Sequence, residues 1–113
     1  MENKIDRIIN EACRLWGMEK EDVLGVDRLS PLPLVRAVIS HGLRNTLGMS
    51  YPKIGKVLNR NHASIIHYMK TYQNEYAYNG AFRKIADEMS IFLLTIRTGL
   101  QEELDNELNE IIG

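Results

Sequence analysis

The sequence predicts an all-α fold, a bundle of about six helices that contains a helix-turn-helix. With 113 residues the chain has room for one compact domain with one core. A 44% share of hydrophobic residues and a 26% share of charged residues are typical of a globular domain. Apolar residues recur at helical spacing, and nowhere do apolar and polar residues alternate over a long stretch as in a β-strand. No apolar run approaches the ~20 residues that a membrane-spanning helix needs.

The N-terminal part predicts a helix, a short helical turn and a loop. An apolar stripe with spacing i, i+3, i+4 and i+7 starts at Ile5 and ends at Gly17, a residue suited to end a helix. Cys13 lies on this stripe, which predicts a small buried hydrophobe, and a single cysteine excludes an internal disulfide. The short helical turn is expected at residues 18–24 and ends at Gly25. The loop is expected at residues 26–30.

The next helix is expected from about Pro31 or Pro33 to Leu47, with Ser30 as its N-cap and Pro31 at its first position. Its expected inward residues are Val35, Val38, Ile39, Gly42 and Leu47. Four-residue steps place Arg36, Ser40 and Arg44 together on another face.

A helix-turn-helix is predicted at residues 51–78. Ser50-Tyr51-Pro52 opens a short helix to Leu58, residues 59–61 interrupt the pattern, and a longer helix runs from about His62 to Tyr78. Ile54 and Leu58 form the buried pair of the first helix, and Gly55 permits a close helix approach at a cost of roughly 1 kcal/mol relative to Ala. Asn59 stands where the turn needs a residue that tolerates positive φ. The expected apolar side of the longer helix consists of Ile65, Ile66, Met69, Tyr72 and Tyr76.

Residues 80–113 predict two further helices, which would form a C-terminal extension of a core at residues 1–79. The first has an apolar stripe from Phe82 to Ile96, which is more often core than partner surface. The second, at residues 100–111, is acidic. The alternative is that these two helices form a homodimer interface.

Charge is distributed unevenly along the chain. The net charge is −1, but residues 1–27 and 75–113 hold an excess of Asp and Glu, whereas residues 28–74 hold none. That middle segment contains all three histidines and these seven cationic residues: Arg28, Arg36, Arg44, Lys53, Lys56, Arg60 and Lys70. Because carboxylates repel phosphates, a basic segment without them is suited to nucleic acid.

The exposed side of the longer helix carries groups that can read DNA. Asn pairs with adenine, Arg with guanine or phosphate, and His or Ala contacts a thymine methyl group, while the helix N-terminus attracts phosphate. Asn61 is a candidate both for a base contact and for the N-cap of this helix, and one side chain can serve both roles. His62 and His67 are five residues apart, a spacing that does not align two rings on a helix, so no metal site is expected.

The string SYPKIGKVLNRNHASIIHYMKTY, residues 50–72, resembles the signature S-L-x-x-I-G-x-x-F-G-G-R-D-H-[ST]-T-V-x-H-A of the C-terminal DNA-binding domain (domain IV) of the bacterial replication initiator DnaA. The resemblance covers residues 33–72 and, less closely, the chain from Ile5. It implies a Trp-repressor-like helix-turn-helix that binds double-stranded DNA, in replication control, transcription control or a mobile element.

The resemblance also implies site residues. The major-groove readers fall on Asn61, His62 and Ala63, and the minor-groove arginine falls on Arg28. The remaining candidate DNA contacts are Arg36, Arg44, Ser50, Tyr51, Pro52, Lys53, Arg60, Ser64, His67 and Lys70. This chain departs from the family at four places. Asn59 replaces paired glycines, Asn61 replaces an aspartate, and Ala63 replaces a hydroxyl-bearing residue. The loop that is basic in the family keeps only one basic residue here, Arg28. An altered or weaker sequence preference is therefore expected.

Several function classes are not expected of this chain. It contains no G-x-x-x-x-G-K-[ST] string, so no nucleotide binding or ATPase activity is expected, and the pattern favours a stand-alone DNA-binding domain. No nucleophile and base pair, carboxylate dyad or metal cluster is evident, so neither enzyme activity nor a cofactor is expected. The first residues hold no secretory signal, which favours a cytoplasmic protein without membrane attachment. A protein-interaction module that kept the fold and lost DNA reading is the alternative function.

Overall fold

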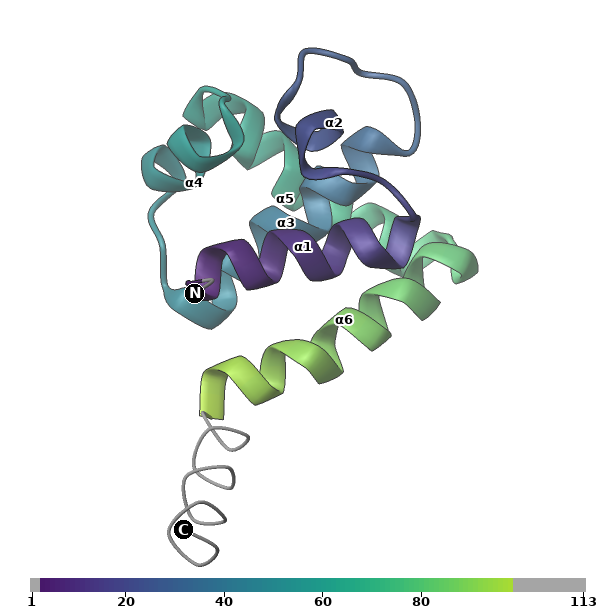
Figure 1. The fold of residues 1–113 in the computed structure, drawn as a ribbon. Helices are drawn as coiled ribbons and strands as arrows, with labels where there is room; N and C mark the ends of the chain where they lie inside the picture. The colour runs from purple at the N-terminus through teal and green to yellow at the C-terminus, as the bar shows by residue number, and fades with distance from the viewer. Residues whose placement is uncertain (1–2, 99–113) are drawn as a thin grey trace, which may run out of the picture.

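The computed structural model describes residues 3–98, which contain six α-helices and no β-strand (Figure 1). The predicted all-α fold is confirmed. In chain order the helices are α1 (Lys4–Trp16), α2 (Lys20–Leu24), α3 (Leu32–Leu47), α4 (Tyr51–Leu58), α5 (His62–Tyr78) and α6 (Gly80–Thr98). None of these six combines the length and the apolar character that crossing a bilayer requires. The acidic helix expected at residues 100–111 lies outside the described residues.

Local capping determines where α1 and α2 begin and end. The Asn3 side chain accepts a hydrogen bond from the backbone N–H of Asp6 (2.8 Å), and Gly17 ends α1 with φ of 67°. Glu19 and Asp22 form a reciprocal capping box at the start of α2. Cys13 is buried as predicted, and burial raises the pKa of its thiol to about 11.

Helix α3 is the centre of the molecule and packs against each of the other five described helices (Figure 1). Six consecutive residues, 35–40, are therefore buried. The prediction of a separate polar face for Arg36 and Ser40 is wrong, because both are 0% exposed, whereas Arg44 is exposed. The predicted Ser30 cap is also wrong, because α3 starts at Leu32 and its N-cap position is held by Pro31, which follows a cis peptide bond.

The inward side of α5 consists of Ile65, Tyr68 and Tyr72. The predicted burial of Ile66 and Tyr76 is wrong, since they are 39% and 37% exposed. Tyr68 lies three residues after Ile65, and Tyr72 lies four residues after Tyr68, so the three side chains share one face of the helix. Ile66 lies about 100° around the helix from Ile65.

Helix α6 lies across α1, α3 and α5 and buries the stripe Phe82, Ala86, Met89, Leu93 and Ile96 against them (Figure 1). The Phe82 ring contacts Tyr72 edge-on, with ring centroids 5.5 Å apart. The prediction that this stripe is core is confirmed. These α6 residues belong to one core with the helices before them.

The turn between α4 and α5 has the predicted backbone. Asn59 adopts the left-handed conformation, with φ of 58° and ψ of 45°. The backbone N–H of Arg60 donates to the carbonyl of Gly55 (2.7 Å), so the turn folds back onto α4. A Cβ on Gly55 would lie 2.5 Å from the Arg60 carbonyl oxygen, so the turn backbone, rather than the expected crossing with another helix, requires glycine here.

Candidate nucleic-acid interface

The N-terminus of α5 begins at the turn and is exposed. Asn61 is its N-cap: Oδ1 accepts from the backbone N–H of Ser64 (2.9 Å) and from the Ser64 hydroxyl (3.2 Å). The predicted capping role of Asn61 is thereby confirmed. The Nδ2 donors are not used in this cap, so Asn61 is able to donate to a base edge without leaving it.

The side chains of His62 and Ala63 follow this cap and are exposed, as are His67 and Lys70 further along α5. Ser64 is half-buried, with its hydroxyl held by Asn61. No group of three or more His, Cys, Asp or Glu in the described part of the chain could hold a metal ion. The surface at the start of α5 thus carries hydrogen-bonding groups without a carboxylate.

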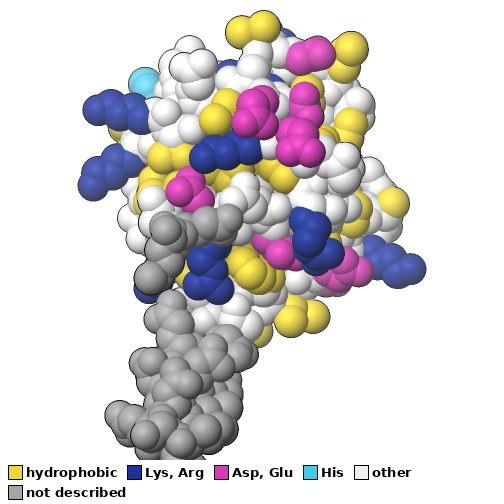
Figure 2. Space-filling model, in the orientation of Figure 1, with side chains coloured by type: hydrophobic (Ala, Val, Ile, Leu, Met, Phe, Trp, Pro, Cys, Tyr) yellow, Lys and Arg dark blue, Asp and Glu magenta, His cyan; other side chains and the backbone are white. Residues whose placement is uncertain are grey.

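The N-terminus of α4 forms a second exposed helix end. Ser50 caps it by accepting from the backbone N–H of Lys53 (3.4 Å), and Pro52 and Lys53 are exposed. Arg44 stacks over the Tyr51 ring, 4.9 Å from its centroid, and donates to the Met49 carbonyl (3.0 Å). Figure 2 shows Lys and Arg side chains protruding over α4, while acidic side chains gather over α2.

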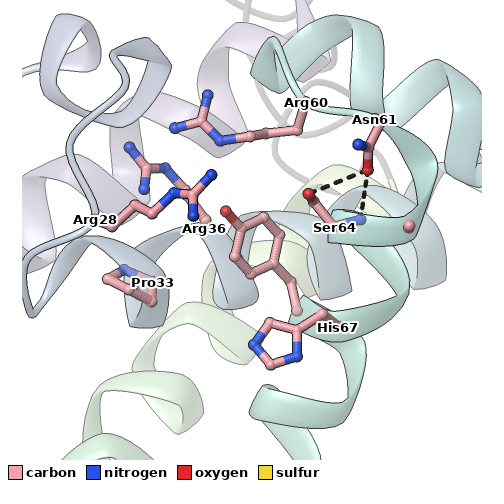
Figure 3. Close-up of a pocket in the computed structure, with 9 residues that line it drawn as sticks. Arg28, Pro33, Arg36, Arg60, Asn61, Ser64 and His67 are labelled. Carbon is pink, nitrogen blue, oxygen red and sulfur yellow. Dashed lines mark hydrogen bonds between the residues drawn. The ribbon is translucent and has the colours of Figure 1, made fainter.

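A groove of about 430 Å³ lies between the loop that precedes α3 and the first turns of α5. Figure 3 shows Arg28 and Pro33 on the loop side and Asn61, Ser64 and His67 on the helix side. The groove brings together seven predicted site residues: Arg28, Arg36, Arg60, Asn61, Ala63, Ser64 and His67. The other seven, which do not line it, are Arg44, Ser50, Tyr51, Pro52, Lys53, His62 and Lys70.

Tyr68 and Pro33 also line the groove, although the sequence did not single them out as site residues. For Tyr68 a signal was present, because it lies three residues after Ile65 and four before Tyr72, on the inward side of α5. No comparable signal marks Pro33, which lies in the first turn of α3.

Arg36 is a structural residue, so its prediction as a phosphate contact is wrong. The guanidinium is buried and donates to four backbone carbonyls: Val23 (2.9 Å), Asp27 (2.7 Å), Asp22 (3.3 Å) and Gly25 (3.1 Å). Burial, together with the nearby Arg60 cation, lowers the pKa of Arg36. Arg36 thus holds the end of α2 and the following loop against α3.

Arg60 is half-buried and lines the groove. Nη1 donates to the carbonyl of Asn59 (3.0 Å), and Nη2 donates to the carbonyl of Gly25 in the loop. In Figure 3 its side chain reaches from the α5 side toward the loop. Arg28 itself is exposed at the loop tip, between the exposed Val26 and Leu29. The candidate interface therefore consists of two helix N-termini, a groove and a loop.

Comparison with known proteins identifies the family. The model of the bacterial DnaA protein helix-turn-helix matches residues 5–71, more than half of the chain. Chromosomal replication initiator protein DnaA of Pseudothermotoga lettingae is 26% identical over 62 residues, 55% of this chain and 14% of that protein. The proteins of the same name from Mycoplasma genitalium and Mycoplasma pneumoniae are 32% identical over 59 residues, 52% of this chain and 14% and 13% of theirs. The matched part thus spans about one seventh of these relatives. By this match and by its fold, the chain belongs to the bacterial DnaA helix-turn-helix family, a family of DNA-binding domains.

Proposed function

We propose that this protein binds double-stranded DNA by placing the N-terminus of α5 in the major groove and Arg28 in the adjacent minor groove. The observation that carries the proposal is the groove itself, whose lining contains two accessible arginines and no carboxylate. A DNA backbone is negatively charged along its whole length, so a carboxylate-free surface of this kind favours its approach.

In this proposal the residues divide into readers and phosphate contacts. Asn61, His62 and Ala63 face the base edges, because they are exposed at the first turn of α5. The proposed phosphate contacts are Arg44, Ser50, Tyr51, Pro52, Lys53, Arg60, Ser64, His67 and Lys70, grouped around the N-termini of α4 and α5 and along α5. Arg36 is left out because it is buried.

The cap geometry limits how Asn61 reads a base. A bidentate contact with adenine uses both Oδ1 and Nδ2, but Oδ1 already accepts two hydrogen bonds from Ser64. Asn61 is therefore left with its Nδ2 donors alone, which any acceptor on a base edge can satisfy. This supports a sequence preference that is weaker than a bidentate contact would give.

The proposed activity is binding without catalysis, in the control of replication or transcription or in a mobile element. Selection from random duplexes, followed by fluorescence anisotropy on the enriched sequence, tests it. The logarithm of affinity should fall steeply and linearly with the logarithm of salt concentration, and Lys53→Ala should reduce that slope by about one. An affinity that does not change between low and moderate salt would contradict the proposal.

A homodimer is a second proposal, and an observation on α6 favours it. Ile91 and Leu94 are 67% and 58% exposed beside a hollow of about 290 Å³, although the inner stripe of α6 is used in the core. Two copies joined there would present two groups of reading residues to one duplex. Sedimentation equilibrium tests this: a monomer at high concentration would contradict it, whereas a dimer should be lost in Ile91→Asp.

A further inference from the structure

The loop that carries Arg28 is exposed at its tip. Val26 is 88% exposed and Leu29 is 72% exposed, so packing does little to hold this segment. Within the tip, Asp27 Oδ1 accepts from the backbone N–H of Leu29 (3.2 Å) and the Leu29 carbonyl accepts from the backbone N–H of Leu32 (2.9 Å). These bonds shape the loop but leave its position relative to α5 undetermined.

Two arginines hold the base of the loop, and they come from different elements. Arg36 in α3 donates to the carbonyls of Gly25 and Asp27, which ties the loop to the centre of the fold. Arg60 donates to the same Gly25 carbonyl from the turn between α4 and α5, across 35 residues of sequence. Gly25 therefore joins the loop to the turn that begins α5.

The contact between Arg60 and Gly25 depends on the guanidinium group, which a lysine lacks. The planar guanidinium of Arg60 donates at once to Asn59 in its own turn and to Gly25 in the loop. Beside it lies a hollow of about 260 Å³ lined by Val26, Arg28, Asn59, Arg60, Asn61 and Ser64. Without the Arg60 contact, the loop has this space to move into.

We propose that Arg60 is a positioning residue, which fixes the Arg28 loop relative to the N-terminus of α5 so that the two contact neighbouring DNA grooves as one rigid unit. The inference rests on the proposed DNA binding. It assigns Arg60 a role beyond charge, because the contribution of Arg28 to affinity depends on the bond between Arg60 and Gly25.

A double-mutant cycle tests the proposal with the charge of Arg60 preserved. Arg28→Ala, Arg60→Lys and the double variant are compared by fluorescence anisotropy on the duplex that the unmodified protein selects. Arg28→Ala should weaken binding about tenfold in the unmodified protein and less than about twofold in the Arg60→Lys background. An equal fold-loss in both backgrounds would overturn the proposal.

Arg44→Lys is the matched control, because Arg44 is a cation that bonds to Met49 and Tyr51 and not to the loop. Arg28→Ala should cost the same fold-loss in that background as in the unmodified protein. Coupling of the same size with Arg44 would indicate a general charge effect and would overturn the positioning role.

A measurement without DNA separates this inference from the proposed function. In free Arg60→Lys, the amides of Leu29 and Leu32 should exchange with solvent about tenfold faster, while those of Ile65 and Tyr68 in α5 keep their rates. Arg60→Gln repeats the test if the lysine variant melts early. Unchanged loop exchange overturns the inference even if DNA binds. Failure of the unmodified protein to bind any duplex overturns the proposed function and the DNA part of this inference, while faster loop exchange in Arg60→Lys would still show that Arg60 holds the loop.

Discussion

The carbonyl oxygen of Arg60 lies only 2.5 Å from the position that a Cβ on Gly55 would take. Gly55→Ala gains helix propensity of about 1 kcal/mol but forces the turn away from α4, and overpacking of this kind costs about 1 to 3 kcal/mol. We expect a net loss of stability in urea unfolding. Gly80→Ala is the control, because a Cβ there would have nothing within 4 Å, and a similar loss in that variant would contradict the explanation.

Arg36→Met should destabilise the fold by at least about 2 kcal/mol, because it removes a donor from four backbone carbonyls, of which only that of Gly25 keeps another, from Arg60. Urea unfolding at neutral pH measures this. The exposed Arg44→Met should lose less than about 1 kcal/mol. If Arg36→Met kept the stability of the parent and lost only DNA affinity, Arg36 would be a phosphate contact after all.

Asn61→Asp and Asn61→Ala separate the cap from the proposed base contact. Asp keeps the acceptor for Ser64 and should keep stability within about 0.5 kcal/mol, whereas Ala should lose about 1 kcal/mol. Both variants lack the Nδ2 donor, so selection from random duplexes should return an altered preference for each. Identical preference profiles for Asn61→Ala and the parent would remove Asn61 from the readers.

His41 should make stability depend on pH. Its ring is stacked on Tyr72, with centroids 3.7 Å apart and planes within 5°, and burial lowers the pKa of His41 below its ordinary 6.5. The unfolded chain then binds the proton more readily, so the His41 contribution is complete above pH 6.5 and is lost as pH falls through and below that value. The difference in free energy of unfolding between the parent and His41→Gln should be constant from about pH 7.5 to 8 and shrink toward about pH 5.5. A constant difference over the whole range would contradict this.

Local features of this fold are predictable because their causes are local. The bounds of α4 and α5 follow from a capping serine, a proline and apolar spacing, and the left-handed turn follows from Asn59, which tolerates positive φ. The gap in carboxylates over residues 28–74 is likewise visible in the sequence, and it coincides with the groove at α5.

The residues whose burial was wrongly predicted lie against elements that are distant in the sequence, and the sequence does not show which elements pack together. Arg36 resembles a surface cation because four-residue steps group it with Arg44, yet it is buried and bonds to the end of α2 and the following loop. Tyr68 and Ile66 differ by only two positions. The spacing from Ile65 and Tyr72 already indicates Tyr68 as inward, and the packing of α5 against α3 leaves Ile66 exposed.

Periodicity, capping and composition act over a few residues, so the order of amino acids was enough to establish the helical class, the helix-turn-helix and the segment that carries positive charge. Which arginines are free to meet a phosphate depends instead on the folded arrangement of the helices. Arg36 and Arg60 both bond to the carbonyl of Gly25, 11 and 35 residues away in the chain. Every residue has a backbone carbonyl acceptor, so the pattern of side chains does not predict which carbonyl a buried guanidinium binds.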